Sequence, residues 1–518
     1  MLAVRPSGRR FMDRYRRTAL VSAAYLGTFL ASLDISIVNV ALPTLQHALK
    51  TDIAGLQWVV NAYAICLSAF MLSAGPLGDR YGHKRCWLFG VTLFTAGSAL
   101  CALAGDLPLL LLGRAVQGVA GALLIPGAMP ILSHAFPDPR QRAHVIGGWS
   151  AFSALALILG PLVGGLLLES VGWQSIFLIN LPLGLLAIAL GAWGIAERKH
   201  PEHAALDPAG QLLSVLWLGA LTYGLIVAGE QGFDGPAALL SLGVAALALL
   251  AFGRVERKVP RPLVPLQLFR HRPFAVANLA SFILGFSCYS SLFFFSLFLQ
   301  QIQGWSAAET GVRMLPQFVV TGCVSVCFGR LSGRWPVQPL MIAGYGLIGL
   351  SMTAMTGFDG HTPYWLVGSL FALLGLGMGL AVPATGLVVM GCAPPERAGI
   401  ASATMNALRQ TGMSVGIALL GTLMSAQAVR QLSATAGANG FADAASLARE
   451  AVHRHLLPAQ SPGFAELYGA AMTSGFHLAM LVAGGISLLA MGLLLVTHRQ
   501  ARVSLADPPQ PVRNSSRS

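Results

Sequence analysis

The sequence predicts an all-α polytopic membrane protein, and composition, hydropathy and segment length carry that prediction. Of the 518 residues, 55% are hydrophobic and only 10% are charged, whereas a soluble domain carries about 25% charged residues. The mean hydropathy is +0.67. The apolar residues gather in blocks of about 20, each long enough to cross a hydrocarbon core of about 30 Å as a helix. These observations exclude a disordered chain, a nucleic-acid-binding module and a disulfide scaffold.

Fourteen hydrophobic segments are long enough to span a membrane. The first follows a basic stretch, but it is too long for the apolar region of a signal peptide and lacks a cleavage site, so we expect it to be retained. Glycine and proline interrupt many segments, which membrane helices tolerate because neighbouring helices satisfy the freed backbone groups. The expected spans cover residues 19–43, 56–77, 86–105, 108–133, 144–168, 174–196, 209–229, 236–253, 273–300, 309–330, 337–357, 363–391, 398–424 and 473–497.

The distribution of positive charge orients these spans. Loops on the cytoplasmic side of a membrane protein carry an excess of Lys and Arg. If both termini lie on one side, that side receives 26 of the 33 Lys and Arg residues. We therefore expect both termini in the cytoplasm. The exceptions are Lys50, Arg313, Arg430, Arg449 and Arg454 in the opposite loops, and Arg114 and Arg409 inside spans.

Short features recur in the two halves of the chain at a nearly constant offset of about 255 residues. Residues 75–82, after the second span, share Gly, Leu, Arg and an aromatic residue with residues 329–336, after the tenth. The fourth and twelfth spans each hold a Gly and a Pro at the same spacing. The recurrence predicts a duplicated six-span unit whose copies start on the same side of the membrane. Parallel repeats around a midplane site favour a carrier that works by alternating access.

The duplication also predicts the division of the chain. The parts are a basic N-terminal arm (1–18), a six-helix bundle (19–196), a linker with two inserted transmembrane helices (197–272), a second six-helix bundle (273–497) with an extracytoplasmic loop at about 425–472, and a cytoplasmic tail (498–518).

Several motifs resemble those of one transporter family. Residues 33–43 (LDISIVNVALP) resemble the first-span signature of the fourteen-span drug–proton antiporters of the major facilitator superfamily. Residues 75–85 (GPLGDRYGHKR) resemble the superfamily's motif between spans two and three. Residues 114–118 (RAVQG) are similar to its fourth-span motif, and residues 160–165 (GPLVGG) to the antiporter motif of span five. The resemblance covers about residues 18–497 and implies the major facilitator fold, with two parallel six-helix bundles plus two inserted helices.

Asp34 is the candidate proton carrier. It is the only acidic residue well inside a span, and a charge at bilayer depth costs about 2.5–3.5 kcal/mol on insertion scales. Burial favours the neutral form of a carboxyl group, which can then exchange protons. The alternative is an ion pair or hydrogen bond that only joins helices. The resemblance implies that Arg114 modulates proton exchange, but its position near a helix end also allows it to reach for the membrane interface.

The first span presents two polar faces. Ser32, Ser36 and Asn39 share one face, whereas Asp34 lies roughly opposite at 100° per residue. A straight helix therefore cannot aim both faces into one cavity, and the sequence leaves open which face binds substrate.

Other candidate substrate contacts lie in later spans. Span nine carries a stripe of aromatic residues at helical spacing, which is either packing surface or a wall suited to flat lipophilic cations. Span thirteen carries an Arg about eleven residues into the span, which either binds an anionic or polar substrate or pairs with backbone carbonyls. The candidate substrate-binding residues are Asn39, Gln117, Phe286, Tyr289, Phe293 and Arg409.

The resemblance implies conformational roles for two motifs. Small residues in span five let helices approach closely, and its proline favours a bend. The family role of this motif is to seal the cytoplasmic side of the pathway and to bias transport toward export. The charged loop between spans two and three is either a latch between states or a positive patch that sets topology. The residues are Gly160, Pro161, Gly164 and Gly165 in the antiporter motif, and Asp79, Arg80 and Arg85 in the latch.

We therefore predict a proton-coupled multidrug efflux transporter, not an enzyme, that exports varied hydrophobic or cationic compounds by alternating access. The proton gradient is the expected energy source, because the chain has no Walker A pattern. We expect no cofactor and no metal site, since the seven cysteines lie in or beside apolar segments, where thiols usually pack. The alternatives are a narrow-specificity exporter of a single metabolite or antibiotic, and a non-transporting membrane sensor or scaffold.

The expected partners are small-molecule substrates and membrane lipid, with no nucleic acid and with a monomeric transport unit. The polar loop at about 425–472 is either solvated or docks a periplasmic adaptor protein. A high ratio of Arg to Lys is typical of a GC-rich bacterial source, so we expect the protein in a bacterial cytoplasmic (inner) membrane.

Overall fold

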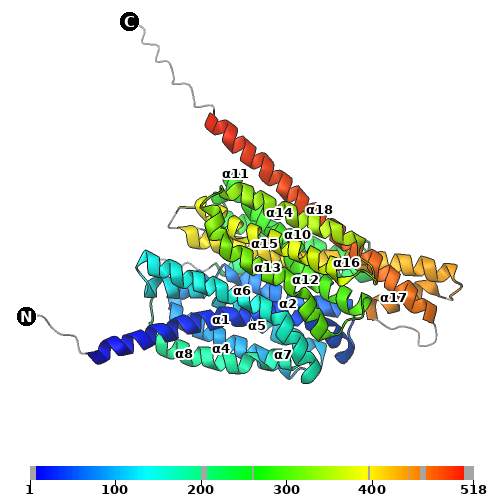
Figure 1. Cartoon of the computed structure of the whole chain (residues 1–518), viewed down its shortest axis with the longest axis horizontal. Coiled ribbons are helices and arrows are strands. Elements are labelled where there is room, and N and C mark those ends of the chain that lie inside the picture. Colours follow the sequence, from blue (N-terminus) through cyan, green and yellow to red (C-terminus); the bar gives the residue numbers. More distant parts are fainter. Residues whose placement is uncertain are drawn as a thin grey trace, which may run out of the picture.

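The computed structural model describes residues 7–199, 207–259, 262–394, 397–441, 443–454 and 462–506. Helices make up nearly all of these residues and lie side by side as one bundle (Figure 1). Within the described residues, 14 helices are long and apolar enough to cross a membrane. This confirms the predicted fold class. The outermost parts of the expected terminal segments, residues 1–6 and 507–518, lie outside the described residues.

The first half of the chain begins with α1 (Ser7–Ala48), a helix of 42 residues that starts in the basic arm and continues through the membrane. The second span is shorter than predicted, because α2 (Ile53–Met71) ends at Met71 and a short helix, α3 (Ala74–Tyr81), contains the charged motif that follows. The remaining helices of this half are α4 (His83–Ala102), α5 (Leu107–Ala135), α6 (Pro139–Ser170), α7 (Ser175–Leu178) and α8 (Asn180–Gly194).

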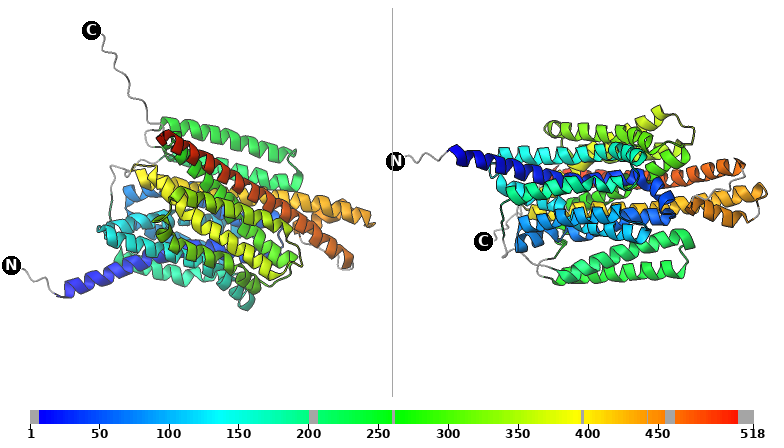
Figure 2. Two further views of the ribbon diagram at one scale, coloured as in Figure 1. Left: turned by 45° about the horizontal axis from the view of Figure 1, so that its top comes forward. Right: turned by 90° about the horizontal axis from the view of Figure 1, so that it is seen from below.

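The inserted pair consists of α9 (Pro208–Gln231) and α10 (Pro236–Lys258), which pack against each other as a hairpin. Figure 2 (right) shows this hairpin at the lower edge of the bundle. α9 also contacts α2 of the first half and α16 (Ala398–Ala438) of the second half. The hairpin therefore covers one seam between the halves.

The second half starts after a short helix, η2 (Leu268–Arg270). Its first span is irregular, since α11 (Arg272–Leu284) and α12 (Ser290–Leu297) alternate with the π-helical turns η3 (Gly285–Tyr289) and η4 (Phe298–Ile302). The remaining elements are α13 (Ala307–Ser332), α14 (Val337–Ala354), η5 (Met355–Gly357), α15 (Tyr364–Gly391), α16, α17 (Ala444–Arg454) and α18 (Pro462–Ala506).

The packing of helices repeats in the two halves. In the first half, α5 packs on α2 and α4, and α1 packs on α6 and α8. In the second half, α15 packs on α13 and α14, and α11 packs on α16 and α18. Helices at equivalent positions of the duplication thus have equivalent neighbours. The contacts between the halves follow the same symmetry, with α6 against α13 and α16 against α2.

The segment expected as a loop at about 425–472 is helical over much of its length. α16 continues to Ala438, α17 follows, and α18 begins at Pro462. These helix ends, coloured orange, project beyond the bundle at the end away from the N-terminus (Figure 2). Phe441 and Phe464 pack there with ring centroids 5.4 Å apart, and Ala451 of α17 is fully buried. The polar sequence hid this arrangement because the apolar residues that form its core are few and widely spaced along the chain.

Candidate functional site

A cavity of about 2260 Å³ lies between the two halves. The first half contributes Thr28 and Ser32 from α1 and Trp149 from α6. The second half contributes Tyr289 and Arg409. Both halves of the duplication therefore build one shared wall, which is the geometry expected of a carrier with a central site.

The cavity is open toward one end of the molecule. Asp79, Arg270 and Arg397 line it there, and we call this end the basic end because most of the Lys and Arg residues in loops belong to it. The opposite end is the one that carries Lys50 and Arg313.

At the opposite end the two halves close on each other. Gln300 donates a hydrogen bond to the Val40 carbonyl at 2.9 Å, and Gln301 donates one to the Gln46 side chain at 2.8 Å. Both bonds join the first span of one half to the first span of the other. They hold the two halves together at this end.

The glycines of the antiporter motif lie at this closed contact. A Cβ on Gly165 would come within 2.5 Å of a carbonyl oxygen of α13, and a Cβ on Gly311 of α13 would come within 2.2 Å of the Pro161 carbonyl oxygen. Gly160 and Gly164 pack against α1 in the same way. Small residues thus let α6 approach both α1 and α13. The resemblance implied a seal on the cytoplasmic side, but in this structure the close packing seals the end opposite to the basic end.

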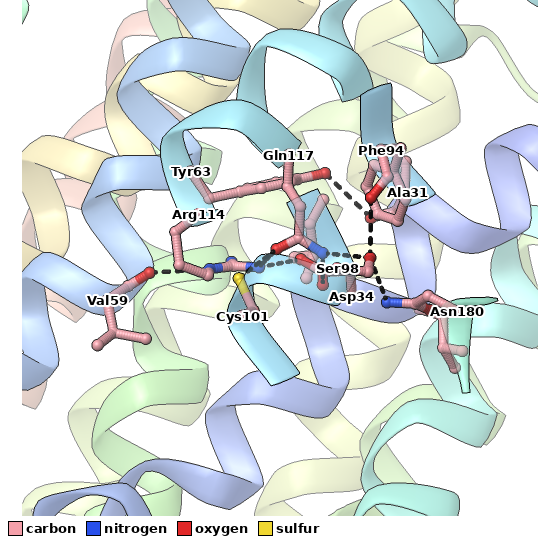
Figure 3. A network of polar contacts seen from close by, with 12 residues as sticks. Ala31, Asp34, Val59, Tyr63, Phe94, Ser98, Cys101, Arg114, Gln117 and Asn180 are labelled. Carbon is pink, nitrogen blue, oxygen red and sulfur yellow. Dashed lines mark hydrogen bonds and ion pairs between the residues drawn. The ribbon is translucent and has the colours of Figure 1, made fainter. Parts of the chain in front are cut away.

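Asp34 lies inside the first half, where it forms an ion pair with Arg114 of α5 (Figure 3). Asp34 is 0% and Arg114 is 1% exposed. Arg114 also donates hydrogen bonds to the Val59 carbonyl at 3.0 Å and to Gln117 at 2.8 Å. Gln117 in turn donates to the second carboxylate oxygen of Asp34 at 3.1 Å. The Arg114 side chain is therefore anchored in the bundle and does not reach for the membrane interface.

Further polar side chains surround this pair (Figure 3). Ser98 of α4 accepts hydrogen bonds from Gln117 at 2.8 Å and from Asn180 of α8 at 3.3 Å. Tyr63 of α2 lies against the guanidinium group, whose central carbon is 4.5 Å from the ring centroid, and its hydroxyl donates to a carbonyl of α1 at 3.2 Å. Five helices of the first half thus contribute to one network. Buried charges are tolerated where they are paired and hydrogen-bonded in this way.

α1 connects the network to the cavity. Thr28, Ser32 and Ile35 line the cavity, whereas Asp34 contacts α5 on another face of the same helix. Ser32 also shares a hydrogen bond of 2.9 Å with Ser153 of α6, another residue of the cavity wall. Of the face that carries Ser32, Ser36 and Asn39, Ser32 lines the cavity, whereas Ser36 and Asn39 are buried and donate hydrogen bonds to backbone carbonyls. A change at Asp34 can therefore reach the cavity wall through one helix.

The candidate substrate residues lie in different places. Tyr289 and Arg409 line the cavity and contact each other, with the guanidinium carbon 5.5 Å from the ring centroid. Arg409 also donates a hydrogen bond to Asn406, which lines the same cavity. Gln117 belongs to the buried network, and the Asn39 amide donates to a carbonyl of its own helix at 2.7 Å.

The aromatic stripe expected in span nine is interrupted. Regular helical spacing would place Phe286, Tyr289 and Phe293 on one face, but the π-helical turn η3 widens the helix within this stretch. As a result Tyr289 lines the cavity, whereas Phe286 is 3% and Phe293 is 0% exposed. Phe293 packs edge-on against Phe294 with ring centroids 5.2 Å apart. Sequence periodicity assumed a regular helix and could not anticipate this change of face.

The residues of the expected latch lie at the basic end. Asp79 Oδ1 is 3.1 Å from His83 Nε2, and Asp79 also lines the cavity. Arg85 pairs with Glu197 at 3.6 Å, and Arg80 lies over a neighbouring tyrosine ring at 5.6 Å. The Asp79–His83 contact thus joins α3 to the start of α4, and the Arg85–Glu197 pair joins α4 to the chain that follows α8.

Two sets of residues escaped the sequence analysis. Tyr63 and Ser98 are ordinary residues in apolar spans, and only their position beside Arg114 gives them a role in the network. Ser68 of α2 shares a hydrogen bond of 2.6 Å with Thr411 of α16, which joins the two halves. No pattern along the chain distinguishes these hydroxyl groups from those that bond within their own helix.

Comparison with known proteins agrees with this geometry. The model of the Major Facilitator Superfamily matches residues 24–417. The structure resembles that of the D-xylose–proton symporter, with a TM-score of 0.58 and 14% identity over 92% of this chain and 97% of that chain. It also resembles a bacterial homolog of the human lysosomal transporter Spinster, with a TM-score of 0.59 and 18% identity over 93% and 98% of the two chains. At such identities the likeness concerns the fold alone.

Relatives of higher identity are drug-resistance proteins. The methylenomycin A resistance protein of Bacillus subtilis is 35% identical over 422 residues, which cover 80% of this chain and 88% of the relative. The multidrug resistance protein Stp of Mycobacterium tuberculosis is 35% identical over 415 residues, which cover 80% and 77%. The tetracenomycin C resistance and export protein of Streptomyces glaucescens is 32% identical over 492 residues, which cover 92% and 91%. The chain therefore belongs to the major facilitator superfamily, as a transporter related to its drug-resistance and efflux proteins.

Proposed function

We propose that this protein is a proton-coupled exporter of varied hydrophobic or cationic compounds in a bacterial cytoplasmic (inner) membrane, with both termini in the cytoplasm. In that orientation the basic end is cytoplasmic, so the cavity is open to the compartment from which an exporter takes its substrate. The observation that carries the proposal is the buried Asp34–Arg114 pair directly behind the cavity wall.

The pair gives proton binding a structural consequence. Protonation of Asp34 removes its negative charge and leaves Arg114 as a buried cation, held by Gln117 and the Val59 carbonyl. Breaking a buried ion pair costs about 3–5 kcal/mol, which is comparable to what moves a two-state equilibrium from one state to the other. In this mechanism the Asp34–Arg114 ion pair forms in the inward-facing state, after Asp34 has released its proton to the cytoplasm. Proton uptake from outside belongs to the outward-facing state.

α1 couples this event to the substrate. The helix carries Asp34 on one face and Thr28, Ser32 and Ile35 in the cavity wall. A shift of α1 that follows the loss or gain of the Arg114 contact therefore changes the wall that a substrate touches. Proton and substrate then favour different states, which is the requirement for exchange transport.

The cavity supports a broad range of substrates. Its volume of about 2260 Å³ exceeds the roughly 300–1,000 Å³ of a typical small-molecule pocket. Met129, Met378 and Met405 line it, and methionine side chains adapt to differently shaped ligands. Trp149 and Tyr289 add aromatic surface for stacking.

A narrow-specificity exporter is the second candidate, because two relatives are named for one antibiotic each, methylenomycin A and tetracenomycin C. Efflux assays with a panel of chemically unrelated compounds separate the two. Export of several classes supports the multidrug transporter, whereas export of one compound and its close analogues supports the narrow exporter.

The coupling is tested in proteoliposomes that contain the full-length protein, a fluorescent lipophilic cation and an imposed pH gradient. We expect gradient-driven transport by the wild type and its loss in Asp34→Asn. Asp106→Asn is the matched control, since Asp106 is exposed and caps α5, and Asn caps a helix as well as Asp. Equal gradient-driven rates in the wild type and Asp34→Asn would remove Asp34 from the coupling mechanism.

A further inference from the structure

Two buried carboxyl groups lie at the base of the inserted hairpin. Asp207 immediately precedes α9, and Glu256 lies in the last turn of α10, so the two groups mark the two ends of the hairpin. Asp207 is 6% and Glu256 is 2% exposed. Glu256 also belongs to the cavity wall near the basic end. The proposed transport mechanism makes no use of either group.

Each carboxyl group has one satisfied oxygen and one unsatisfied oxygen. Asp207 Oδ1 accepts a hydrogen bond from the Gly210 N–H at 2.8 Å, which caps α9. Glu256 Oε2 accepts one from the Val264 N–H at 3.0 Å. Within the described residues, Asp207 Oδ2 and Glu256 Oε1 are buried without a hydrogen-bond partner. Burying an ionised carboxylate oxygen without a hydrogen-bond partner costs free energy. A bound ligand at these two oxygens would remove that cost.

The two unsatisfied oxygens converge on one point. A Cβ on Gly210 would lie 2.4 Å from Asp207 Oδ2 and 2.9 Å from Glu256 Oε1. Glycine leaves that point free, and the two oxygens therefore face each other across a small space.

No opposite charge neutralises the pair in the part of the chain that the structure describes, where the ion pairs involve other residues. Arg257 and Lys258 follow Glu256 on α10, but both are exposed. The other charged or titratable groups that line the cavity near this end are Asp79 of α3, Arg257 of α10, Arg270 and His271 of the linker, and Arg397 just before α16.

We propose that Asp207 and Glu256 form a proton-binding site that keeps one proton on the pair at neutral pH. Two neighbouring buried carboxyl groups without a cation between them cannot both ionise cheaply, so one proton is retained. That proton turns one of the unsatisfied oxygens into a donor and removes one of the two charges. A proton fits the site better than a metal ion does, since among the described residues no group of three or more His, Cys, Asp or Glu side chains is arranged to hold one.

The site has a consequence for the linker between the halves. Glu256 holds the Val264 N–H, and the chain continues from there through η2 into α11 of the second half. Loss of the proton would place two like charges at the base of the hairpin and weaken this attachment. The site thus senses the pH at the basic end, and it does so independently of Asp34.

Infrared difference spectroscopy of the full-length protein in lipid nanodiscs tests the proposal, because a protonated carboxyl group has its own C=O band. We expect a band at neutral pH that persists in Asp34→Asn and disappears in Glu256→Gln. In Asp207→Asn, which keeps the helix cap, the titration midpoint moves to lower pH by about one unit or more, since a like charge is removed. Glu466→Gln, at an exposed position of α18, is the matched control and leaves the band unchanged.

Three results would overturn the proposal. These are a band that survives in Glu256→Gln, a midpoint that stays or moves upward in Asp207→Asn, and a wild-type band that Na⁺, K⁺ or Ca²⁺ abolishes at constant pH, which would mark a cation site. If Glu256→Gln does not fold, the midpoint in Asp207→Asn decides alone. A failure of the Asp34 coupling experiment leaves this test unaffected, because the band is measured without transport.

Discussion

Asp34 and Arg114 each bring a full charge into the interior of the first half, and each depends on the other to remain there. A buried ion pair adds little stability compared with a well-packed apolar pair, but removal of one partner alone is strongly destabilising. Arg114 has two further anchors, the Val59 carbonyl and Gln117. We therefore expect variants of this network to change stability as well as transport, and the two effects have to be measured separately.

The first prediction concerns this stability. Arg114→Gln leaves Asp34 buried without its cation, so we expect a loss of about 3–5 kcal/mol in the free energy of unfolding. The double variant Asp34→Asn/Arg114→Gln has no buried charge at this place and should regain most of that loss. Denaturant unfolding of the purified protein in detergent gives the complete double-mutant cycle. Strictly additive effects of the two substitutions would contradict the ion pair.

At this scale the sequence identified the main residues but not their partners. Asp34 stood out as the lone acid inside a span, and Arg114 as part of a motif. Their contact depends on how α1 and α5 turn toward each other, which local spacing does not determine. Tyr63 and Ser98 remained unnoticed for the same reason.

At the scale of helices, the close approach of α6 and α13 keeps the opposite end shut. Its tightest point is Gly311 against the Pro161 carbonyl. The motif in residues 160–165 predicted close packing, yet which helices it joins, and at which end, followed only from the fold. The aromatic stripe of span nine shows the limit of periodicity, since the π-helical turn η3 separates Tyr289 from its expected companions.

The second prediction concerns this closure. In Gly311→Ala the new Cβ would lie 2.2 Å from the Pro161 carbonyl oxygen, so α6 and α13 must separate. The measurement uses a protein without native cysteines that carries Ser32→Cys in the cavity wall. A thiol reagent added from the opposite end should label this cysteine several times faster when Gly311→Ala is also present than when it is absent. Gly329→Ala on the same helix is the control, because among the described residues no atom beyond its own stretch of helix lies within 4 Å of the new Cβ. Equal labelling rates in the two glycine variants would contradict the role of this contact.

The third prediction concerns the attachment of α17. Its His453 carbonyl accepts a hydrogen bond from Gln46 of the first half at 3.4 Å. Burial lowers the pKa of His453, and Arg449 acts in the same direction, whereas Asp52 partly opposes them. Because the folded protein holds this histidine neutral, its stabilising effect is present at high pH. It decreases as the pH falls below the unfolded-state pKa of about 6.5, and it is lost as the pH falls through the lowered pKa of the folded state.

Hydrogen–deuterium exchange measures that effect. Backbone exchange in α17 should accelerate at about pH 5.5 relative to pH 7.5 in the wild type, after correction for intrinsic exchange rates. In His453→Gln, which cannot gain the charge, this acceleration should disappear. A pH response that survives in His453→Gln would assign it to another group.

At the scale of the whole molecule, the two halves form one bundle that is open at the basic end and closed at the opposite end. The span count, the duplication and the family resemblance followed from composition, charge and short motifs, because each of these features depends on residues that are close together in the sequence. The open state did not, since it depends on contacts such as Gln300 with Val40 between residues far apart in sequence. The helical projection of α16, α17 and α18 was missed because its apolar core is small.

The central claim is that Asp34 couples proton movement to the exchange of states. The most direct test compares two rates in the same proteoliposomes, namely substrate transport driven by a pH gradient and substrate exchange at equal pH on both sides. If Asp34 is the coupling group, Asp34→Asn loses the gradient-driven rate and retains exchange, because the halves still alternate. If Asp34 serves only to join helices, Asp34→Asn changes both rates by the same factor, and the account of coupling is wrong.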